Sequence, residues 1–427
     1  MKKPNFLIPV LLILVAVLAF SAAAALLFRR SPLPEPAPVP SPEPPVTAAP
    51  LPEPTAAPLP EPTAATEPTP EPEPEPAADA PLSPLYCTIW PVKDLEVYAD
   101  VSKETVLGTA PASAMYCVLA EDEENALFRI RLSEGVYGYI DSNYCMIDLP
   151  EYIGGLCSYD ITNSYASLYA IHEYEIPGLT GKLIPGYENV RLADGSFLVP
   201  FLYPCTPKLI AAARDALAAG YRIRICDSYR PRLATDRIYG AAVNILDVML
   251  PPSTYSGVAV SLPPVPEPKE DELPRSYLVY RDLIEQGGWD IGAFLAPGWS
   301  QHNRGGAIDM TFEDARSGQA VTAQTNMHDL SAYSTIYSNN AAAGVILRLM
   351  EAHGLHNIVS EWWHFQDNEL LNALKPPYCE KGVSAEGWIA DAEGEMYRRA
   401  DGSLVTDCVL VTEEGAFAFD AQGHRIP

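Results

Sequence analysis

The sequence has few basic residues for its length. It contains 28 Lys and Arg residues against 55 Asp and Glu residues, so its formal net charge is -27 over 427 residues. Proteins that bind nucleic acid concentrate Lys and Arg, because these side chains neutralise phosphate charges. The composition therefore argues against nucleic acid as a partner.

Closely spaced cysteine pairs of the kind that bind zinc are also missing. None of the eight cysteines forms a Cys-x-x-Cys pair, which excludes the usual cysteine-based zinc sites. An even number of cysteines outside the cytoplasm can form disulfides, whereas buried free cysteines behave as small apolar side chains. The sequence leaves both possibilities open for Cys87, Cys117, Cys145, Cys157, Cys205, Cys226, Cys379 and Cys408.

Charge is absent from one long segment near the N-terminus. Lys2 and Lys3 precede an uncharged run over residues 6–28, which ends at Arg29 and Arg30. The run matches the roughly 20 apolar residues that span a bilayer. We expect residues 1–30 to be a transmembrane signal anchor, with a signal peptide cleaved near residues 22–25 as the alternative. Both place the rest of the chain outside the cytoplasm, at the cell membrane or secreted.

Residues 31–84 contain no Lys or Arg and consist mostly of Pro, Ala, Glu and Thr. The octet Ala-Pro-Leu-Pro-Glu-Pro-Thr-Ala occurs twice, at residues 49–56 and 57–64. Such a composition cannot bury an apolar core. We expect a disordered, extended Pro/Glu-rich linker.

Residues 85–148 contain short alternating segments separated by turns, which predicts a small all-β domain. The segment Gly-Val-Tyr-Gly-Tyr-Ile at residues 135–140 resembles the Gly-x-x-Gly-Tyr-Val signature of bacterial SH3-like domains. The resemblance implies a small SH3-like barrel, and such domains often bind cell-wall peptides. A role as a spacer is the alternative.

Helix and strand signals alternate over residues 149–380, which predicts an α+β domain. Thr206 and Pro207 predict the start of a helix, with Thr206 as N-cap, and Gly220 predicts its end. Residues 222–225 alternate like a strand, and residues 342–353 predict a second helix that ends before Gly354. A Pro-rich insertion at residues 251–274 is expected to form a surface loop.

The C-terminal segment, residues 384–427, carries a weak repeat. Glu-Gly pairs at residues 393–394 and 414–415 are 21 residues apart, with aromatic residues nearby. The pattern predicts a β-hairpin tail and resembles the cell-wall-binding repeats of surface proteins. A plain hairpin that packs on the preceding domain is the alternative.

Two segments carry the residues that suggest chemistry. Ser-Gln-His-Asn-Arg-Gly-Gly-Ala-Ile-Asp at residues 300–309 is followed by Glu-Trp-Trp-His at residues 361–364. His302, Asp309 and His364 offer two imidazoles and a carboxylate, and catalytic zinc takes three protein ligands plus a water. Glu361 can accept a proton from that water. The other histidines have no comparable setting: His172, His328, His353, His356 and His424.

This joint pattern resembles the VanX-type D-alanyl-D-alanine dipeptidases and the D,D-carboxypeptidase superfamily around them. The resemblance covers roughly residues 155–378 and implies a zinc peptidase domain with an antiparallel sheet. It implies Zn²⁺ ligands at His302, Asp309 and His364, with Glu361 as the general base. The double Trp after Glu361 favours the dipeptidase branch.

The resemblance extends to four further residues. Asp-Ser-Tyr-Arg-Pro at residues 227–231 looks like the family's Asp-x-Tyr-Arg-Pro motif, which gives Arg230 the role of stabilising the oxyanion. Tyr187 and Ser300 are expected to contact the substrate, and the alternative for Ser300 is that it only shapes the turn. Asp329 falls near the family's aspartate for the substrate ammonium group, although that alignment needs a shift of one residue.

Together these features predict zinc-dependent hydrolysis of D-alanyl-D-alanine at the cell envelope. One alternative is a D,D-carboxypeptidase that removes terminal D-Ala from peptidoglycan stem peptides, which the expected location outside the cytoplasm favours. Another is a non-catalytic wall-binding protein. The expected partners are the dipeptide or stem peptide, the cell wall, and the membrane through the N-terminal helix.

Overall fold

The computed structural model describes residues 84–171, 173–243, 292, 294–321, 323–331, 334, 341–358 and 360–427. The expected anchor at residues 1–30, all but the last residue of the linker, and the Pro-rich insertion at residues 251–274 lie outside these residues. Within the described ranges, no helix is both long enough and apolar enough to cross a membrane.

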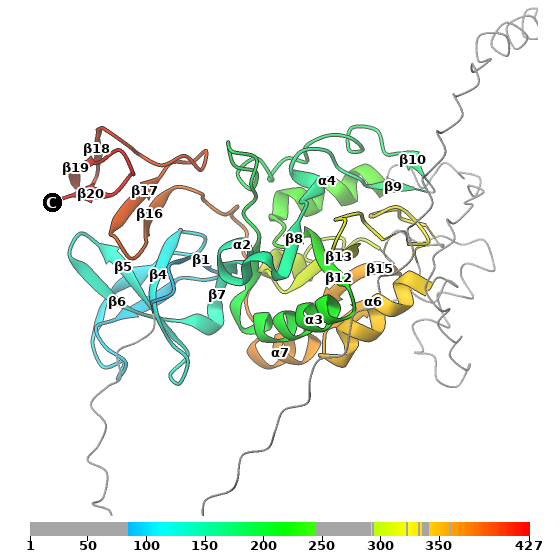
Figure 1. The fold of residues 1–427 in the computed structure, drawn as a ribbon, viewed down its shortest axis with the longest axis horizontal. Helices are drawn as coiled ribbons and strands as arrows, with labels where there is room; N and C mark the ends of the chain where they lie inside the picture. Colours follow the sequence, from blue (N-terminus) through cyan, green and yellow to red (C-terminus); the bar gives the residue numbers. More distant parts are fainter. Residues whose placement is uncertain are drawn as a thin grey trace, which may run out of the picture. The chain divides into compact units, whose positions relative to one another are not determined.

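The first part of the described chain is all β, as the alternation over residues 85–148 predicts. Strands β4, β5 and β6 pair in sequence as an antiparallel meander, and apolar side chains alternate inward along them. The buried cluster includes Ile89, Val97, Val118, Phe128 and Ile140. Seven strands belong to this region (Figure 1): β1 (Cys87–Pro91), β2 (Leu95–Tyr98), β3 (Val106–Ala110), β4 (Tyr116–Asp122), β5 (Leu127–Ser133), β6 (Val136–Asp141) and β7 (Cys145–Asp148).

This sheet has an open strand order, β11-β7-β1-β4-β5-β6-β2-β3, and no pairing among the described strands closes it into a barrel. The expected barrel is therefore not confirmed. An eighth strand, β11 (Pro200–Leu202), comes from the next part of the chain and pairs with β7, with Phe201 opposite Ile147. The sheet thus continues across the expected boundary at residue 148.

The second sheet has the order β14-β15-β13-β12-β8. All its pairings are antiparallel except that of β12 with β8, which is parallel, so the expected antiparallel sheet is in fact mixed. The mixed sheet and its few helices fit an α+β peptidase domain. Its strands are β8 (Cys157–Tyr159), β12 (Tyr221–Asp227), β13 (Ala307–Asp314), β14 (His356–Ile358) and β15 (Glu361–Gln366), and a separate two-stranded ribbon contains β9 (Ala170–Ile171) and β10 (Tyr174–Glu175).

Helices cover this sheet, and α3, α6 and α7 gather along one side of it (Figure 1). Helix α3 buries the apolar face that contains Leu209, Ala213 and Ala216, and Gly220, with φ of +87°, follows its end. Thr206 is the first residue of α3 and not its N-cap, which is Cys205. The helices are α2 (Leu149–Ile153), α3 (Thr206–Ala218), α4 (Arg232–Val243), α6 (Ala341–Ala352) and α7 (Asn368–Leu374).

The tail forms β-hairpins, as residues 384–427 predict. Trp388 packs edge-on against Phe417 and Tyr397, with ring centroids 4.9 Å and 5.3 Å away, and Val405 and Phe419 complete a small apolar cluster. The hairpin strands are β16 (Gly387–Ala390) with β17 (Glu395–Arg398), and β18 (Val409–Thr412) with β19 (Gly415–Phe419) and β20 (Arg425–Ile426).

The segment before the tail connects the first sheet to the loop after β12. The indole N–H of Trp90 donates to the Ser384 carbonyl over 2.8 Å, and the hydroxyl of Tyr229 donates to the Cys379 carbonyl over 3.1 Å. The guanidinium of Arg398 donates to Glu151 over 3.0 Å. The contact of Tyr229 ties the loop that carries its neighbour Arg230 to this segment.

All eight cysteines are free thiols in this structure, which resolves the choice that the sequence leaves open. Seven of them are buried and Cys408 is exposed. Burial raises the pKa of the Cys117 thiol to about 12, so this thiol stays protonated. The buried cysteines therefore act as small apolar side chains.

Candidate metal centre and active site

Two of the three expected metal ligands face each other across a strand pair. Asp309 on β13 pairs directly with His364 on β15. Residues directly opposite in an antiparallel pair have their Cβ atoms about 4.5–5.5 Å apart and project from the same face. The strand register thus brings together two residues that are 55 positions apart in the sequence.

His302 reaches the same point from a 3-10 helix at Gln301–Arg304. Ser300 caps this helix, because its backbone N–H donates to the Asn303 side chain over 2.8 Å. Gly305 ends it with φ of +66°, and a Cβ at this position would lie 2.7 Å from the sulfur of Met146. Glycine is therefore required three residues after His302, where the chain turns into β13.

The three side chains form a nearly equilateral triangle of donor atoms. His302 Nε2 lies 3.2 Å from His364 Nδ1 and 3.3 Å from Asp309 Oδ1. His364 Nδ1 lies 3.2 Å from the same carboxylate oxygen. A tetrahedral zinc ion with bonds of about 2.0–2.1 Å has its ligand atoms about 3.3–3.4 Å apart. The residues present therefore fit a zinc ion in both chemistry and spacing.

Hydrogen bonds on the far side of each ring keep the inward nitrogens free to accept. His302 Nδ1 lies 2.6 Å from the Ser228 carbonyl, to which its N–H donates. His364 Nε2 lies 3.1 Å from Gln366 Oε1, which accepts in the same way. Such outer hydrogen bonds fix the tautomer of a metal-binding histidine. Both imidazoles are thus oriented as ligands.

The pKa shifts of two of the three candidate ligands also suit a cation site, whereas the hydrogen bond to Asp309 and its charge outweigh burial and raise the pKa of the third, His364. Burial lowers the pKa of His302, which favours the neutral ring. Burial alone would raise the pKa of Asp309, but His302 and hydrogen bonds from His328 and His364 outweigh it and hold that pKa well below its usual range. A metal ligand must be a neutral imidazole or an ionised carboxylate. His302 and Asp309 already have these forms.

Glu361 lies at the start of β15, with Oε2 3.9 Å from His364 Nδ1. The indole N–H of Trp363 donates to the same carboxylate oxygen over 3.0 Å. Burial raises the pKa of Glu361 to about 8, although His364 opposes this shift, and the charge of Asp309 adds to it. A carboxylate with a pKa near neutrality can both take up and release a proton, as a general base must.

The side-chain amide of Asn357 holds Glu361 and His364 in register. Its Nδ2 donates to the carbonyl of Glu361 and to the carbonyl of His364, each over 2.8 Å. The pairing of β14 with β15 shifts between Asn357 and Ile358, so the backbone at this point is irregular. One amide therefore bridges both ends of the Glu-Trp-Trp-His segment.

Arg230 is buried and is oriented by a carboxylate beneath it. Asp227 Oδ2 accepts hydrogen bonds from Arg230 Nε over 3.1 Å and from Nη2 over 2.8 Å, and Nη2 also lies 3.3 Å from Asp309 Oδ2. The backbone N–H of Arg230 donates to the His302 carbonyl over 3.0 Å. Its Nη1 has no hydrogen-bond partner within the described part of the chain, so it is available to a ligand.

These groups line one cavity of about 310 Å³. Arg230, His302, Glu361, His364 and Ser300 all lie on its wall. Ligand pockets combine a few convergent polar groups with apolar walls, and this cavity has both. The apolar part of the wall includes Ile238, Phe294, Leu295, Trp299 and Ile358.

Two expected substrate contacts lie behind the cavity instead of on its wall. Tyr187 is fully buried, and its hydroxyl lies 2.8 Å from both carboxylate oxygens of Asp227. Asp329 is also buried, and its Oδ2 accepts a hydrogen bond from the Glu173 backbone over 3.0 Å. Both side chains form hydrogen bonds within the protein, so in this structure they support the site and do not face the cavity.

His328 was not among the residues selected from the sequence, yet it contacts the candidate metal ligand Asp309. Its Nε2 lies 3.0 Å from Asp309 Oδ2, and its ring stacks on Tyr169 with centroids 4.3 Å apart. The available signal was its place next to Asp329, the residue that the resemblance selected.

Two other groups of acidic and histidine side chains lie close together. Asp227, Asp309 and His328 are buried neighbours, but the guanidinium of Arg230 already bridges the two carboxylates. The positive charge of Arg230 would repel a cation at this position. The other group contains Asp391, Glu393 and His424 in the tail.

Comparison with known proteins gives two matches. Residues 291–382 match a family model described as D-ala-D-ala dipeptidase. A D-alanyl-D-alanine dipeptidase of Enterococcus faecalis (strain ATCC 700802 / V583) is 24% identical over 197 residues, which is 44% of this chain and 79% of that protein. Both matches support a peptidase of this superfamily. The first includes His302, Asp309, Glu361 and His364.

Proposed function

We propose that this chain is a zinc-dependent D,D-dipeptidase that hydrolyses D-alanyl-D-alanine. The observation that carries the proposal is the triangle of His302, Asp309 and His364, whose donor atoms are 3.2–3.3 Å apart beside the cavity that Glu361 and Arg230 line. If these buried polar groups had only a structural role, Glu361 and Arg230 would not need to face the same cavity. The match to the D-ala-D-ala dipeptidase family model supports the choice of bond.

His302, Asp309 and His364 would hold the zinc ion. When bound, the ion lowers the pKa of a water molecule and polarises the carbonyl of the scissile bond. His328 and Gln366, which contact Asp309 and His364, keep these ligands in position.

The other side chains move the proton and stabilise charge. Glu361 accepts a proton from the attacking water as the water oxygen bonds to the carbonyl carbon. Arg230 donates from Nη1 to the carbonyl oxygen as that oxygen becomes negative. Glu361 then gives the proton to the leaving amine as the C–N bond breaks. The products are two molecules of D-alanine.

We also propose that the domain acts outside the cytoplasm. The uncharged run over residues 6–28 supports attachment to the extracytoplasmic face of the membrane, or secretion if the run is cleaved. The SH3-like signature in residues 85–148 and the hairpins of residues 384–427 support contact with the cell wall. In that location a D,D-carboxypeptidase that acts on stem peptides is the second candidate.

The experiment incubates zinc-loaded protein with D-alanyl-D-alanine or with a stem pentapeptide, and measures the released D-alanine. We expect hydrolysis of the dipeptide and little hydrolysis of the pentapeptide. Cleavage of the pentapeptide alone would reject the dipeptidase in favour of the carboxypeptidase. Cleavage of neither substrate would reject both and favour a wall-binding protein without activity.

A further inference from the structure

We propose that a second pocket, between the first sheet and the tail, binds a primary ammonium group such as a lysine-type side chain of a peptide. The pocket has a volume of about 300 Å³ and is lined from β4, β5, β16, β17 and the turn between β18 and β19. It shares no lining residue with the cavity beside His302 and His364. The proposal therefore stands independently of the peptidase activity.

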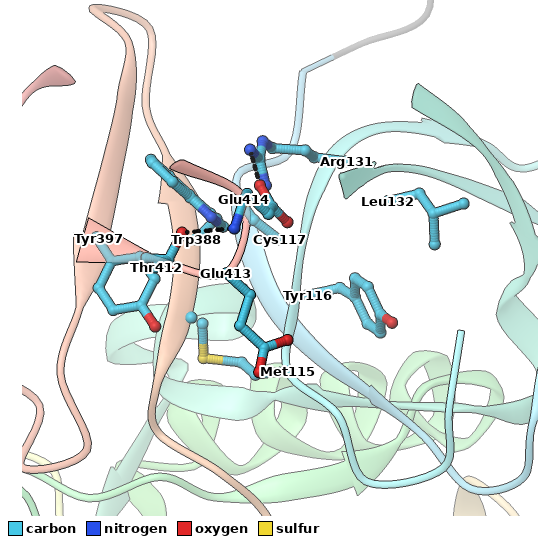
Figure 2. Close-up of a pocket in the computed structure, with 11 residues that line it drawn as sticks. Met115, Tyr116, Cys117, Arg131, Leu132, Trp388, Tyr397, Thr412, Glu413 and Glu414 are labelled. Carbon is cyan, nitrogen blue, oxygen red and sulfur yellow. Dashed lines mark hydrogen bonds and ion pairs between the residues drawn. The ribbon is translucent and has the colours of Figure 1, made fainter. Parts of the chain in front are cut away.

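Three aromatic side chains are among the residues that line this ammonium pocket. Tyr116 comes from β4, Trp388 from β16 and Tyr397 from β17, and Figure 2 shows Tyr116 on one side of Glu413 and Tyr397 on the other. The rings of Trp388 and Tyr397 are perpendicular, at 89°. Aromatic faces attract ammonium groups through their negative quadrupole, most strongly where water is partly excluded.

The arginine in the pocket is already neutralised. Arg131 forms ion pairs with Glu414 and, over 3.0 Å and 3.3 Å, with Glu134 and Glu395. Its guanidinium lies 4.3 Å from the ring centroid of Trp388 and covers one face of that ring. Arg131 therefore serves to join the first sheet to the tail, and its charge is balanced before any ligand arrives.

The remaining charge around the pocket is negative. Arg131 and Arg425 contribute two positive formal charges, whereas Glu134, Glu395, Glu413 and Glu414 contribute four negative ones, a sum of -2. Glu413 is exposed and makes no hydrogen bond or ion pair with the described residues. Its side chain extends into the pocket in Figure 2. Glu413 is thus the acceptor that a bound cation would use.

The same charge excludes another occupant from within the chain. Aromatic grooves in small β domains often bind Pro-rich segments, and residues 31–84 are such a segment. That segment carries glutamates and no Lys or Arg, so the acidic pocket repels it. A cationic ligand from outside the chain is the occupant that the charges favour.

The test follows the indole N–H signal of Trp388 by NMR in the full-length protein, with the signal assigned from its loss in Trp388→Phe. The probe is Nα-acetyl-L-lysine N-methylamide, and the matched neutral probe is the norleucine analogue. A peptide of residues 49–64 tests the chain's own linker. We expect the lysine probe alone to shift the Trp388 signal, and added salt to weaken the effect.

Glu413→Gln should reduce the affinity for the lysine probe about three- to fivefold, as expected for an exposed ion pair. Glu123→Gln, which removes an exposed carboxylate outside the pocket, should leave the affinity unchanged. Equal shifts with the norleucine probe, a shift with the linker peptide, or no shift with any probe would each overturn the proposal. None of these outcomes depends on D-alanine release, so they leave the peptidase question separate.

Discussion

His328 Nε2 lies 3.0 Å from Oδ2 of Asp309, on the opposite side of that carboxylate from the candidate metal position. The other oxygen, Oδ1, faces His302 and His364. His328 has φ of +61°, a backbone conformation that is uncommon for a residue other than glycine. An unfavourable backbone conformation beside a candidate metal ligand indicates that the position of this imidazole matters to the candidate site.

His328→Ala should weaken zinc binding. The substitution removes the donor that orients Asp309, and loss of such an outer contact typically costs about 10- to 100-fold in metal affinity. Competition with a chelator measures the zinc affinity. His353→Ala is the matched control, because His353 pairs with Asp215 at the surface away from the cavity. Equal zinc affinities of the two variants would show that His328 does not support the site.

Glu361→Gln should abolish turnover while zinc remains bound. Gln keeps the shape of the side chain and the partner for Trp363, but it cannot accept a proton. Loss of a general base costs about 10²- to 10⁴-fold in rate. The rate of D-alanine release and the zinc content of the same preparation are both needed. Activity close to that of the parent protein would refute the role of Glu361 as base.

Asn357→Ala should lower kcat about tenfold to a hundredfold with little change in KM. The variant loses the amide that bridges the carbonyls of Glu361 and His364, so the proposed base moves relative to the candidate metal ligand. Steady-state kinetics separate this effect from a loss of binding. Asn125→Ala, in the turn between β4 and β5, is the control. A change in KM alone would contradict a positioning role.

Glu121 should make the stability of the first sheet depend on pH. Burial, with a smaller contribution from Glu123, raises its pKa from 4.5 to about 7. Below pH 4.5 the carboxyl is protonated in both states. As the pH rises to about 7, the unfolded chain releases the proton and the folded chain retains it, so stability falls. Above pH 7 the folded protein carries the full cost of a half-buried charge, about 1 kcal/mol after allowance for its exposure.

Glu121→Gln removes this dependence. Its melting temperature should equal that of the parent protein near pH 4 and exceed it at pH 8, as thermal unfolding would show. Glu104→Gln, at an exposed position, should melt with the parent protein at both pH values. A difference that is the same at both pH values would contradict the pKa argument.

The sequence motif and the strand register select the same metal-ligand candidates for different reasons. His302, Asp309 and His364 were selected because the two motifs that contain them resemble those of a zinc peptidase family. Their contact depends on Asp309 pairing with His364 across β13 and β15, which no local pattern in one sequence determines. The helix ending before Gly220 and the strand at residues 222–225 were predictable, because glycine conformation and side-chain alternation are local properties.

Long-range features were not predictable in the same way. β11 joins the first sheet because Phe201 pairs with Ile147, and the sequence carries no mark of that register. Tyr187 was expected to contact the substrate, but its hydroxyl is held by Asp227, a partner 40 residues away. His328 was missed because its role depends on a loop that brings it to Asp309. Each case is a contact between segments that local propensity does not encode.

The most direct test titrates zinc into metal-free protein and measures the D-alanine released from D-alanyl-D-alanine. The account predicts that activity rises with zinc and saturates at one ion per chain, and that His364→Ala neither binds zinc tightly nor releases D-alanine. A zinc-saturated protein that leaves the dipeptide intact, or hydrolysis that persists in His364→Ala, would contradict it.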